Sequence, residues 1–548
     1  MYKKAFLFFV FVLACASLVY PAEPRLVVVI SLDQFRSDYI TRWRQYFGKG
    51  GFNYLLQSGA TFTNAAYTHA VNTTGPGHAA MLSASYGNVN GIIANDWYDR
   101  SLNKSVYCVE DRGVAIVGSG GAGRSPRNFL GSTFGDELRL KTGFRAKVLS
   151  LSNKDRAAIL MGGKLANGAF WMMDSVFVTS TYYMSELPAW VQAFNRSRVL
   201  DSFFGETWSR KLPASAYAGE DVDDASYEKD ENGLGRTFPH KIRGNDSTRI
   251  TPSYYGAMWS SPFSAKALCE LAKHAVRNEQ LGRREVTDLL CLSFSATDGV
   301  GHAFGPNSHE VMDLALRMDE ILADLFSFLD SSVGLKNCVI VLTADHGVAP
   351  IPEYLLAHNT NMNAGRIRVK EIESFCSAVL TKRFGEPKQG MKWIHAIVGS
   401  SIYLNRPLFD QMNFPTLEWA AKELADSLRT LPPIAAAYSS RELLTMPGSD
   451  PLERKMKRSF YRLRSGDVMF ALKPFWLESD SPFGTTHGSP YAYDAHVPLI
   501  FAGNGIRKGT YANDASPIDI APTLCTLLGI EFPAGSEGRV LTEALLFP

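Results

Sequence analysis

Aspartate and histidine recur together in short glycine-containing stretches of this sequence, and these are the residues that could do chemistry. The stretch Ala344-Asp345-His346-Gly347 follows an apolar run directly, and Gly347 permits the turn that would let the two polar side chains converge. A carboxylate and an imidazole held together at the edge of a sheet suit a divalent metal, above all zinc. Taken alone, the motif is as typical of an ordinary loop.

Other positions offer the same kinds of ligand. Asp298 and His302 are four residues apart, so they share one side of a helical turn. His487 lies in a loop of small residues, and Asp33 ends an apolar strand. Each alone has an ordinary explanation, as a helix cap or an exposed loop residue. Together with Asp345 and His346 they divide into two metal sites in one cleft. Two divalent ions there could clamp the attacking and the leaving oxygen of a displacement at phosphorus.

A hydroxyl residue could be presented to the same cleft. Thr73 and Thr74 precede the sequence Gly75-Pro76-Gly77-His78, which predicts a corner between an extended run at residues 60–66 and a helix that starts at Ala79. Such a corner can hold one side chain out of the regular hydrogen-bonding pattern. A threonine before a glycine-proline turn is by itself more typical of a helix cap. His78 is expected to support the corner and not to bind metal.

The elements that must position these residues alternate along the chain. Apolar runs at residues 26–30, 146–150, 289–295, 338–343 and 498–502 predict strands, and residues 309–329 carry a helical rhythm. We therefore expect an α/β fold, a mostly parallel central sheet with helices on both faces, which binds ligands at the carboxyl ends of its strands. The irregular stretches at about 165–285 and 355–480 are interpreted as insertions, the first as a cap over the site. The acidic stretch at residues 221–230 lacks the full EF-hand pattern and is predicted to be solvated.

The bulk composition excludes several classes of function. The 548 residues include 56 basic and 54 acidic ones, so no overall charge recruits nucleic acid, and the basic run at residues 454–464 is predicted to be a solvated helix face. Residues 1–22 are interpreted as a signal peptide for secretion or export to the periplasm, with lipid anchoring through Cys15 as the less favoured alternative. No later segment is apolar enough to span a membrane. The other six cysteines permit disulfides, although Cys291 and Cys338 fit buried free thiols better.

The motifs taken as a set resemble the alkaline phosphatase superfamily, and their order and spacing resemble its PafA-type branch of phosphate monoesterases. The resemblance covers nearly the whole mature chain. It implies two Zn²⁺ ions, one held by Asp298, His302 and His487 and the other by Asp33, Asp345 and His346. It also selects Thr74 as the oxygen ligand of the second ion and as the nucleophile, which would form a covalent phosphothreonine.

The resemblance extends to the substrate side. The segment Gly91–Tyr98 is similar to the family segment whose asparagine donates to a phosphoryl oxygen, which would be Asn95. Lys154 and Arg156 are similar to the Lys-x-Arg pair of the branch, and a lysine charge beside an arginine fork suits a phosphate monoester dianion. Without that match, Lys154-Asp155-Arg156 is more typical of a solvated loop.

The sequence therefore predicts an exported, zinc-dependent alkaline phosphatase that acts on small-molecule phosphate monoesters. A phosphodiesterase or nucleotide pyrophosphatase of the same superfamily is the main alternative, because the metal ligands resemble that branch equally, and Lys154 and Arg156 argue against it. A non-catalytic module that binds phosphorylated ligands is the alternative from another class. A sulfatase is disfavoured because Thr74-Gly75-Pro76-Gly77-His78 lacks the Cys/Ser-x-Pro-x-Arg setting, and a membrane phosphoethanolamine transferase because spanning helices are not found.

Overall fold

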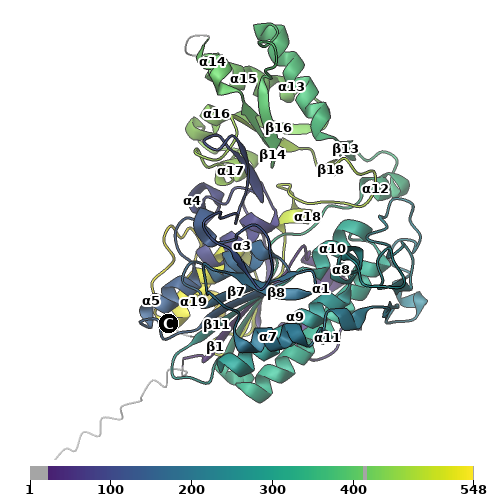
Figure 1. The fold of residues 1–548 in the computed structure, drawn as a ribbon, viewed down its shortest axis with the longest axis vertical. Helices are drawn as coiled ribbons and strands as arrows, with labels where there is room; N and C mark the ends of the chain where they lie inside the picture. The colour runs from purple at the N-terminus through teal and green to yellow at the C-terminus, as the bar shows by residue number, and fades with distance from the viewer. Residues whose placement is uncertain (1–22, 412–415, 547–548) are drawn as a thin grey trace, which may run out of the picture.

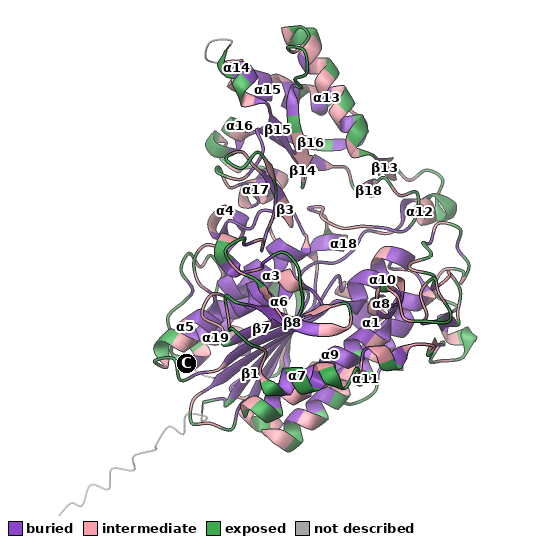
Figure 2. Ribbon diagram, in the orientation of Figure 1, coloured by how far each residue is buried: buried purple, intermediate pink, exposed green. Residues whose placement is uncertain are grey.

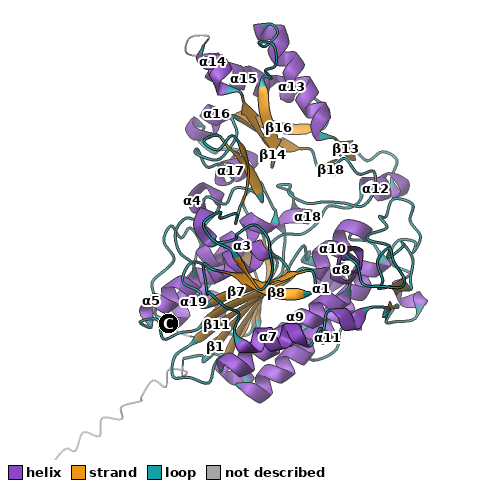
Figure 3. Ribbon diagram, viewed as in Figure 1, coloured by secondary structure: helices purple, strands orange, loops and turns teal. Residues whose placement is uncertain are grey.

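A ten-stranded sheet forms the centre of the computed structural model, which describes residues 23–411 and 416–546 (Figure 1). The strand order is β20-β2-β19-β12-β1-β11-β6-β7-β8-β5, in which the edge strand β5 is Ile116–Val117. Helices pack on both faces of the sheet, and a second lobe stands beyond one end of it (Figures 1 and 3). The predicted α/β class with a mostly parallel central sheet is confirmed. The segment interpreted as a signal peptide, with Cys15, lies outside the described residues.

The inner strands are parallel and their ends are in register. The strand β1 pairs with β11 on one side and β12 on the other, and β11 pairs with β6, all in parallel. In this register Ser31 lies opposite both Ser293 and Thr343, so the strands end at one edge. The bounds of these strands are β1 Leu26–Leu32, β6 Val148–Ser152, β11 Asp288–Phe294 and β12 Cys338–Thr343.

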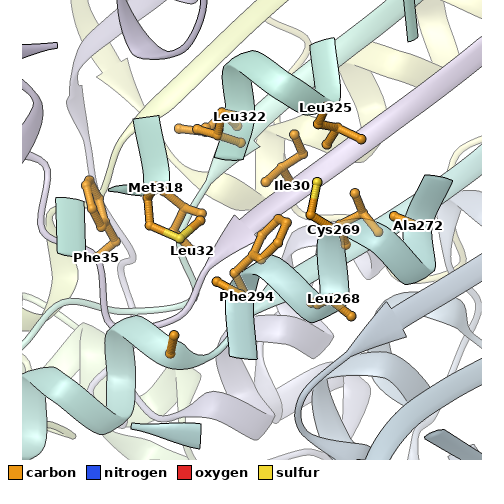
Figure 4. Packing of buried hydrophobic residues seen from close by; sticks show 14 of the residues in the cluster. Ile30, Leu32, Phe35, Leu268, Cys269, Ala272, Phe294, Met318, Leu322 and Leu325 are labelled. Carbon is orange, nitrogen blue, oxygen red and sulfur yellow. The ribbon is translucent and has the colours of Figure 1, made fainter. Parts of the chain in front are cut away.

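Two hydrophobic clusters pack on opposite faces of the sheet because the strands alternate their side chains. Ile30 and Leu32 of β1 lie in one cluster and Val29 in the other. Figure 4 shows the first cluster, where Ile30 and Leu32 meet side chains of two long helices, α9 (Pro262–Glu279) and α11 (His309–Ser332). The inner strands are buried throughout (Figure 2). Continuous apolar runs such as these are what a parallel sheet covered on both sides requires.

The outer part of the sheet departs from the parallel pattern. β19 (Leu499–Gly503), which matches the predicted strand at 498–502, runs antiparallel to both β12 and β2 (Ala60–Ala65). Beyond them β20 (Gly509–Ala515) is parallel to β2. Hydrophobic periodicity identifies a buried strand but not its direction. The direction depends on the connections, because a parallel neighbour needs a crossover.

The boundaries expected for the first insertion need correction. Residues 165–285 contain β7 (Gly168–Met173) and β8 (Val176–Ser180) of the central sheet, as well as the core helix α9. Both strands are short, and only Asp174 and Ser175 separate them, so the hydrophobic pattern of the two does not stand out. The irregular part of this stretch is therefore confined to the residues between β8 and α9.

The stretch expected to be irregular at about 355–480 is instead an ordered lobe. A four-stranded sheet in the order β14-β15-β17-β16 packs against helices α13 (Val369–Phe384) and α15 (Thr416–Leu428) around its own hydrophobic cluster. The strands are β14 Ile394–Val398, β15 Ser401–Leu404, β16 Ile434–Ser439 and β17 Val468–Leu472. This lobe occupies the upper part of Figure 1, where helices α3 (Thr74–Ser83) and α18 (Ala492–Ala495) lie between it and the central sheet.

All six cysteines from Cys108 to Cys525 are free and buried. This confirms the prediction of buried thiols for Cys291 and Cys338. Burial raises the pKa of the Cys338 thiol to about 12, so it stays protonated at neutral pH. Within the described residues, no helix combines the length and the apolar character needed to cross a bilayer.

The acidic stretch at residues 221–230 is only partly solvated, contrary to expectation. Asp224 is exposed and pairs with Arg236, whereas Glu228 is only 2% exposed and its Oε2 has no hydrogen-bond partner. Burial, together with the nearby carboxylates of Glu310 and Asp221, raises the pKa of Glu228 to about 10. The folded chain therefore keeps a proton on this carboxyl group at neutral pH.

We expect Glu228→Gln to stabilise the protein increasingly as the pH rises. The pKa of Glu228 is about 10 in the folded chain and about 4.5 in its ordinary state. Because the folded chain holds a proton that the unfolded chain releases, this group makes stability fall between these two pH values. The substitution should raise the free energy of unfolding by at least about 1 kcal/mol at pH 8 and by almost nothing at pH 4.

Denaturant unfolding at the two pH values measures this effect. Glu285→Gln, at an exposed position, is the matched control and should show no such pH dependence. A variant at Glu228 that is destabilised at pH 8 would contradict the assignment of a protonated carboxyl group.

Candidate active site

Two groups of aspartate and histidine side chains gather at the carboxyl edge of the sheet. Within each group, ligand atoms from all three residues lie within 4.8 Å of one another. The groups are Asp33, Asp345 and His346, and Asp298, His302 and His487. They are the two sets that the family resemblance implied. All six residues come from strand ends or from the loops and helix that follow them.

The first group is fully buried between the ends of β1 and β12. His346 Nε2 lies 3.2 Å from Asp345 Oδ2 and 3.5 Å from Asp33 Oδ1. The chain leaves strand geometry after Thr343, which allows the neighbouring residues Asp345 and His346 to face the same point. The Oδ1 atom of Asp33 and the Oδ2 atom of Asp345 have no hydrogen-bond donor.

The second group is built on helix α10 (Ala296–Phe304) and the loop at His487. Asp298 and His302 are one helical turn apart, and His302 Nε2 lies 3.3 Å from Asp298 Oδ1. His487 Nε2 approaches the same oxygen at 3.5 Å. The His487 ring stacks on the His346 ring at a centroid distance of 3.6 Å, so the two groups adjoin. A β-carbon at Gly301 would lie 1.9 Å from Gln34 Oε1, so a larger residue there would displace the Gln34 side chain that contacts Asp298.

Each of the three histidines has its tautomer fixed by a backbone carbonyl. The Nδ1 atoms of His302, His346 and His487 lie 2.8–2.9 Å from the carbonyl oxygens of Thr485, Gly347 and Asn72. A carbonyl oxygen can only accept, so each Nδ1 must donate. The Nε2 atom of each neutral ring is left as a lone-pair donor that faces the carboxylates. This arrangement is common among histidines that bind a metal.

The electrostatics of the first group favour additional positive charge. Burial, with the carboxylate of Asp345 next, raises the pKa of Asp33 to about 6. Burial alone would lower the pKa of His346, but Asp345 and the other carboxylates outweigh it and raise this pKa to about 9. At neutral pH the His346 ring therefore holds a proton that a divalent cation would displace. The mixed oxygen and nitrogen donors, the free carboxylate oxygens and the fixed Nε2 atoms fit Zn²⁺.

Thr74 lies at the start of helix α3 (Thr74–Ser83), beside the first group. The helix begins five residues earlier than the predicted start at Ala79, because Gly75, Pro76 and Gly77 form its first turn and not a separate corner. A proline in the first turn has no need of its missing N–H. Thr74 is 1% exposed, and its Oγ1 lies 3.5 Å from His346 Nε2.

Gly77 and His78 fix this helix against the first group. A β-carbon at position 77 would lie 2.2 Å from the carbonyl oxygen of Asp345, so only glycine allows the close approach. His78 Nδ1 lies 2.8 Å from the carbonyl oxygen of Thr74 and 3.1 Å from Asp345 Oδ2, while its Nε2 contacts Ser293. The expected supporting position of His78 is thus observed.

Asn95 stands in front of the helix terminus. Its Oδ1 accepts a hydrogen bond from the backbone N–H of Gly75 at 2.7 Å. Because the carbonyl end of the side chain is held in this way, the amide NH₂ is left as the donor. Asn95 immediately precedes β3 (Asp96–Asp99). The structure thus brings this residue to the N-terminus of α3, as the family resemblance implied.

Lys154 and Arg156 reach the same hydroxyl from another strand end. β6 ends at Ser152, and α6 (Asp155–Gly162) begins directly after Lys154, so the pair opens a helix and does not lie in a solvated loop. Lys154 Nζ and Arg156 Nη2 lie 3.4 and 3.3 Å from Thr74 Oγ1. Lys154 Nζ is also 2.7 Å from carboxylate oxygens of Asp33 and Asp298, although only the Asp298 contact has hydrogen-bond geometry.

The sequence-based interpretation missed several supporting residues. Gln34 donates from Nε2 to Asp298 Oδ1 at 2.9 Å, and its backbone N–H donates to Asp345. Tyr107 lies 3.1 Å from Arg156 and hydrogen-bonds to Asp155, and the ring of Trp259 lies 5.7 Å from the Lys154 ammonium. Only Gln34, directly after Asp33, carries a positional signal. Tyr107 and Trp259 approach through tertiary packing, which single-sequence patterns do not show.

The fold and the two ligand groups define an α/β protein with a candidate two-metal site at the carboxyl edge of its sheet. The family model for type I phosphodiesterase / nucleotide pyrophosphatase matches residues 27–383. The chain belongs to this family, which is part of the alkaline phosphatase superfamily.

Relatives match over nearly the full length of the chain. Alkaline phosphatase PhoV of Synechococcus elongatus is 36% identical over 96% of this chain and 93% of its own. Alkaline phosphatase PafA of Elizabethkingia meningoseptica is 35% identical over 95% of each chain. The crystal structure of wild-type PafA superimposes with a TM-score of 0.89 at 34% identity, covering 95% of this chain and 99% of that one. The resemblance to the PafA-type branch is thereby confirmed.

Proposed function

We propose that this chain is an exported, zinc-dependent alkaline phosphatase that hydrolyses phosphate monoesters through a covalent phosphothreonine. Family membership and the named relatives support a phosphatase of the alkaline phosphatase superfamily. The observation that carries the detailed proposal is the position of Thr74 Oγ1, which lies within 3.5 Å of His346, Lys154 and Arg156. Export is proposed from the sequence of residues 1–22, as argued above.

Asp33, Asp345 and His346 would hold one Zn²⁺ and Asp298, His302 and His487 the other. Bound there, the ions would supply Lewis acidity that lowers the pKa of a coordinated hydroxyl and neutralises charge on the phosphoryl group. Both donor sets fit this role, because three neutral Nε2 atoms and three buried carboxylates face the two centres.

Thr74 is the nucleophile in this proposal. Its oxygen forms a bond to phosphorus while the bond from phosphorus to the alcohol oxygen breaks, and the alcohol leaves with a proton. Water then attacks the phosphothreonine, which releases phosphate and returns a proton to Thr74. The N-terminus of α3 and its dipole favour the negative charge at this position.

Three side chains bind the non-bridging phosphoryl oxygens. The Asn95 amide donates one hydrogen bond, and the Arg156 guanidinium offers a fork that matches two oxygens. Lys154 adds a compact positive charge. Burial alone would lower the pKa of Lys154, but Asp298 and Asp33 outweigh it and raise the pKa, so the ammonium stays charged in alkaline solution. Two cationic groups favour a monoester dianion over a diester monoanion.

A phosphodiesterase is the second candidate, favoured by the family to which the chain belongs. A single comparison separates the two functions. Purified protein is stripped with a chelator, reconstituted with Zn²⁺ and assayed on an aryl phosphate monoester and the matching methyl aryl diester. We expect activity to depend on added Zn²⁺ and kcat/KM to favour the monoester by at least about a hundredfold, or 2.7 kcal/mol in transition-state stabilisation.

Metal analysis accompanies this assay. We expect two Zn²⁺ per chain, and Mg²⁺ added to stripped protein serves as the control because it disfavours histidine ligands. Preferential hydrolysis of the diester would replace the proposal by the phosphodiesterase. Binding of the monoester without turnover would favour a non-catalytic module.

A further inference from the structure

A cavity of about 220 Å³ lies between the carboxyl edge of the central sheet and the second lobe. Thr73, His487 and Asp494 line it from the catalytic side. Phe470 of β17, together with Trp476 and Glu478 of β18 (Trp476–Glu478), lines it from the lobe. We call this space the lobe cavity. No residue of the proposed phosphoryl-binding set lines it, so it is a separate part of the cleft.

The lobe cavity adjoins the proposed reaction centre on two sides. His487 belongs to the second ligand group, and Thr73 directly precedes the proposed nucleophile. On another side, Gly399 and Ser400 of the turn between β14 and β15 line the cavity. A β-carbon on Gly399 would lie 2.9 Å from the side chain of Ala94, the residue before Asn95. When the phosphoryl group of an ester lies at the reaction centre, this adjoining cavity is therefore the space available to the alcohol part of the ester.

The lobe cavity is lined by apolar and acidic side chains. Its apolar part includes Phe470 and Trp476, and its acidic side chains are Glu478 and Asp494, with His487 and Tyr493 as the other ionisable ones. No lysine or arginine lines it. Among the residues that the structure places, none forms an ion pair or a side-chain hydrogen bond with Glu478. Asp494 Oδ2 accepts hydrogen bonds from Gly488 and Ser489, and only its Oδ1 has no partner.

We propose that the lobe cavity binds the alcohol part of the substrate and selects phosphate monoesters of amino alcohols. This rests on the phosphatase function proposed above. Aromatic faces beside two carboxylates, of which Glu478 has no partner and Asp494 keeps one oxygen free, form the environment that attracts a substituted ammonium group. The apolar walls accommodate the short carbon chain next to it. The same carboxylates repel an alcohol that carries a second phosphate or a carboxylate, because like charges at short range are unfavourable.

Three esters test this selection with the intact, Zn²⁺-reconstituted protein. Phosphocholine carries the ammonium, neohexyl phosphate replaces its nitrogen by carbon, and phosphoglycolate carries a carboxylate. The kcat/KM of Glu478→Gln is divided by that of the wild type for each ester, which cancels the intrinsic reactivity of each alcohol. We expect a loss of about tenfold for phosphocholine, no more than about twofold for neohexyl phosphate, and a gain for phosphoglycolate.

Matched variants separate the lobe cavity from general damage. Glu386→Gln, at an exposed position of the same lobe, should leave all three ratios near one. Trp476→Ala should lower kcat/KM for phosphocholine and neohexyl phosphate together, while inhibition by inorganic phosphate stays within about twofold in every variant. This last measurement reports the phosphoryl site and also shows that the variants are folded.

Equal losses for the three esters in Glu478→Gln would overturn the proposal, as would an unchanged ratio for phosphocholine. Both outcomes leave the phosphatase function intact, because aryl phosphate hydrolysis continues. A chain that hydrolyses no monoester in any assay refutes the function and the cavity assignment together. The two failures are therefore distinguishable.

Discussion

Thr74→Ala is expected to lower the rate of aryl phosphate hydrolysis by about ten-thousandfold or more. The variant removes the oxygen that lies within 3.5 Å of His346, Lys154 and Arg156, and no other described hydroxyl group contacts all three of these residues. The six candidate metal ligands are untouched, so the Zn²⁺ content should stay at the wild-type value. Thr74→Ser keeps an oxygen at this position and should retain activity to within about tenfold.

Trapping of the phosphothreonine intermediate tests the role of Thr74 independently of the rate. Acid quenching of the wild type during turnover of a labelled monoester should capture a stable phosphoprotein, and Thr74→Ala should give none. A variant that hydrolyses monoesters at the wild-type rate would show that the covalent mechanism is wrong. Loss of both metal and activity would instead place Thr74 in the structure of the site.

Removing the two cations of the phosphoryl site is the second large expected effect. The double variant Lys154→Ala with Arg156→Ala should lower kcat/KM for an aryl monoester by about a thousandfold and for the matching diester by about tenfold or less. The difference arises because the dianion presents one more negative charge and one more terminal oxygen to these groups. The ratio of monoester to diester activity is thus the quantity to measure.

Arg156→Lys is the matched control, because it keeps the charge but loses the planar fork and the contact with Tyr107. It should fall between the wild type and the double variant. Equal losses for monoester and diester would indicate that Lys154 and Arg156 organise the site without recognising the dianion. The Lys154 contacts with Asp33 and Asp298 make metal analysis of each variant necessary.

Much of the fold could be predicted because the inner strands are continuous apolar runs. Cys338–Thr343 was placed to the residue, and β1 and β11 to within two residues. The direction of β19 could not be predicted, because it depends on partners far away in the sequence. The hairpin of β7 and β8 is local, with Met173 opposite Val176, and it was missed inside the stretch interpreted as an insertion. The second lobe was taken for an irregular stretch because its strands are only four to six residues long and β14 is only partly buried.

The candidate site was predictable to the extent that its residues fall in compact motifs. Asp298 with His302 and Asp345 with His346 are close in sequence, so local geometry brings them together. The grouping of Asp33 with Asp345, and of His487 with Asp298, depends on the register of distant strands and loops and came from the family resemblance. The helix start at Thr74 was missed because Gly75 and Pro76 usually terminate helices, whereas here they occupy the first turn.

The close approach of Gly77 to the carbonyl oxygen of Asp345 limits which residues of the site can change during evolution. The helix that carries the nucleophile rests directly on the backbone of a metal ligand, so any larger residue at position 77 would shift both at once. Substitutions at Gly77 are therefore constrained, because each would disturb the nucleophile and the metal ligand together. Lys154 is likewise in contact with two candidate metal ligands, Asp33 and Asp298, whereas Glu478 and Trp476 of the lobe cavity form no hydrogen bond or ion pair with any of the six in the described structure. Single substitutions in the lobe cavity can therefore change the substrate preference while the nucleophile and the metal ligands stay the same.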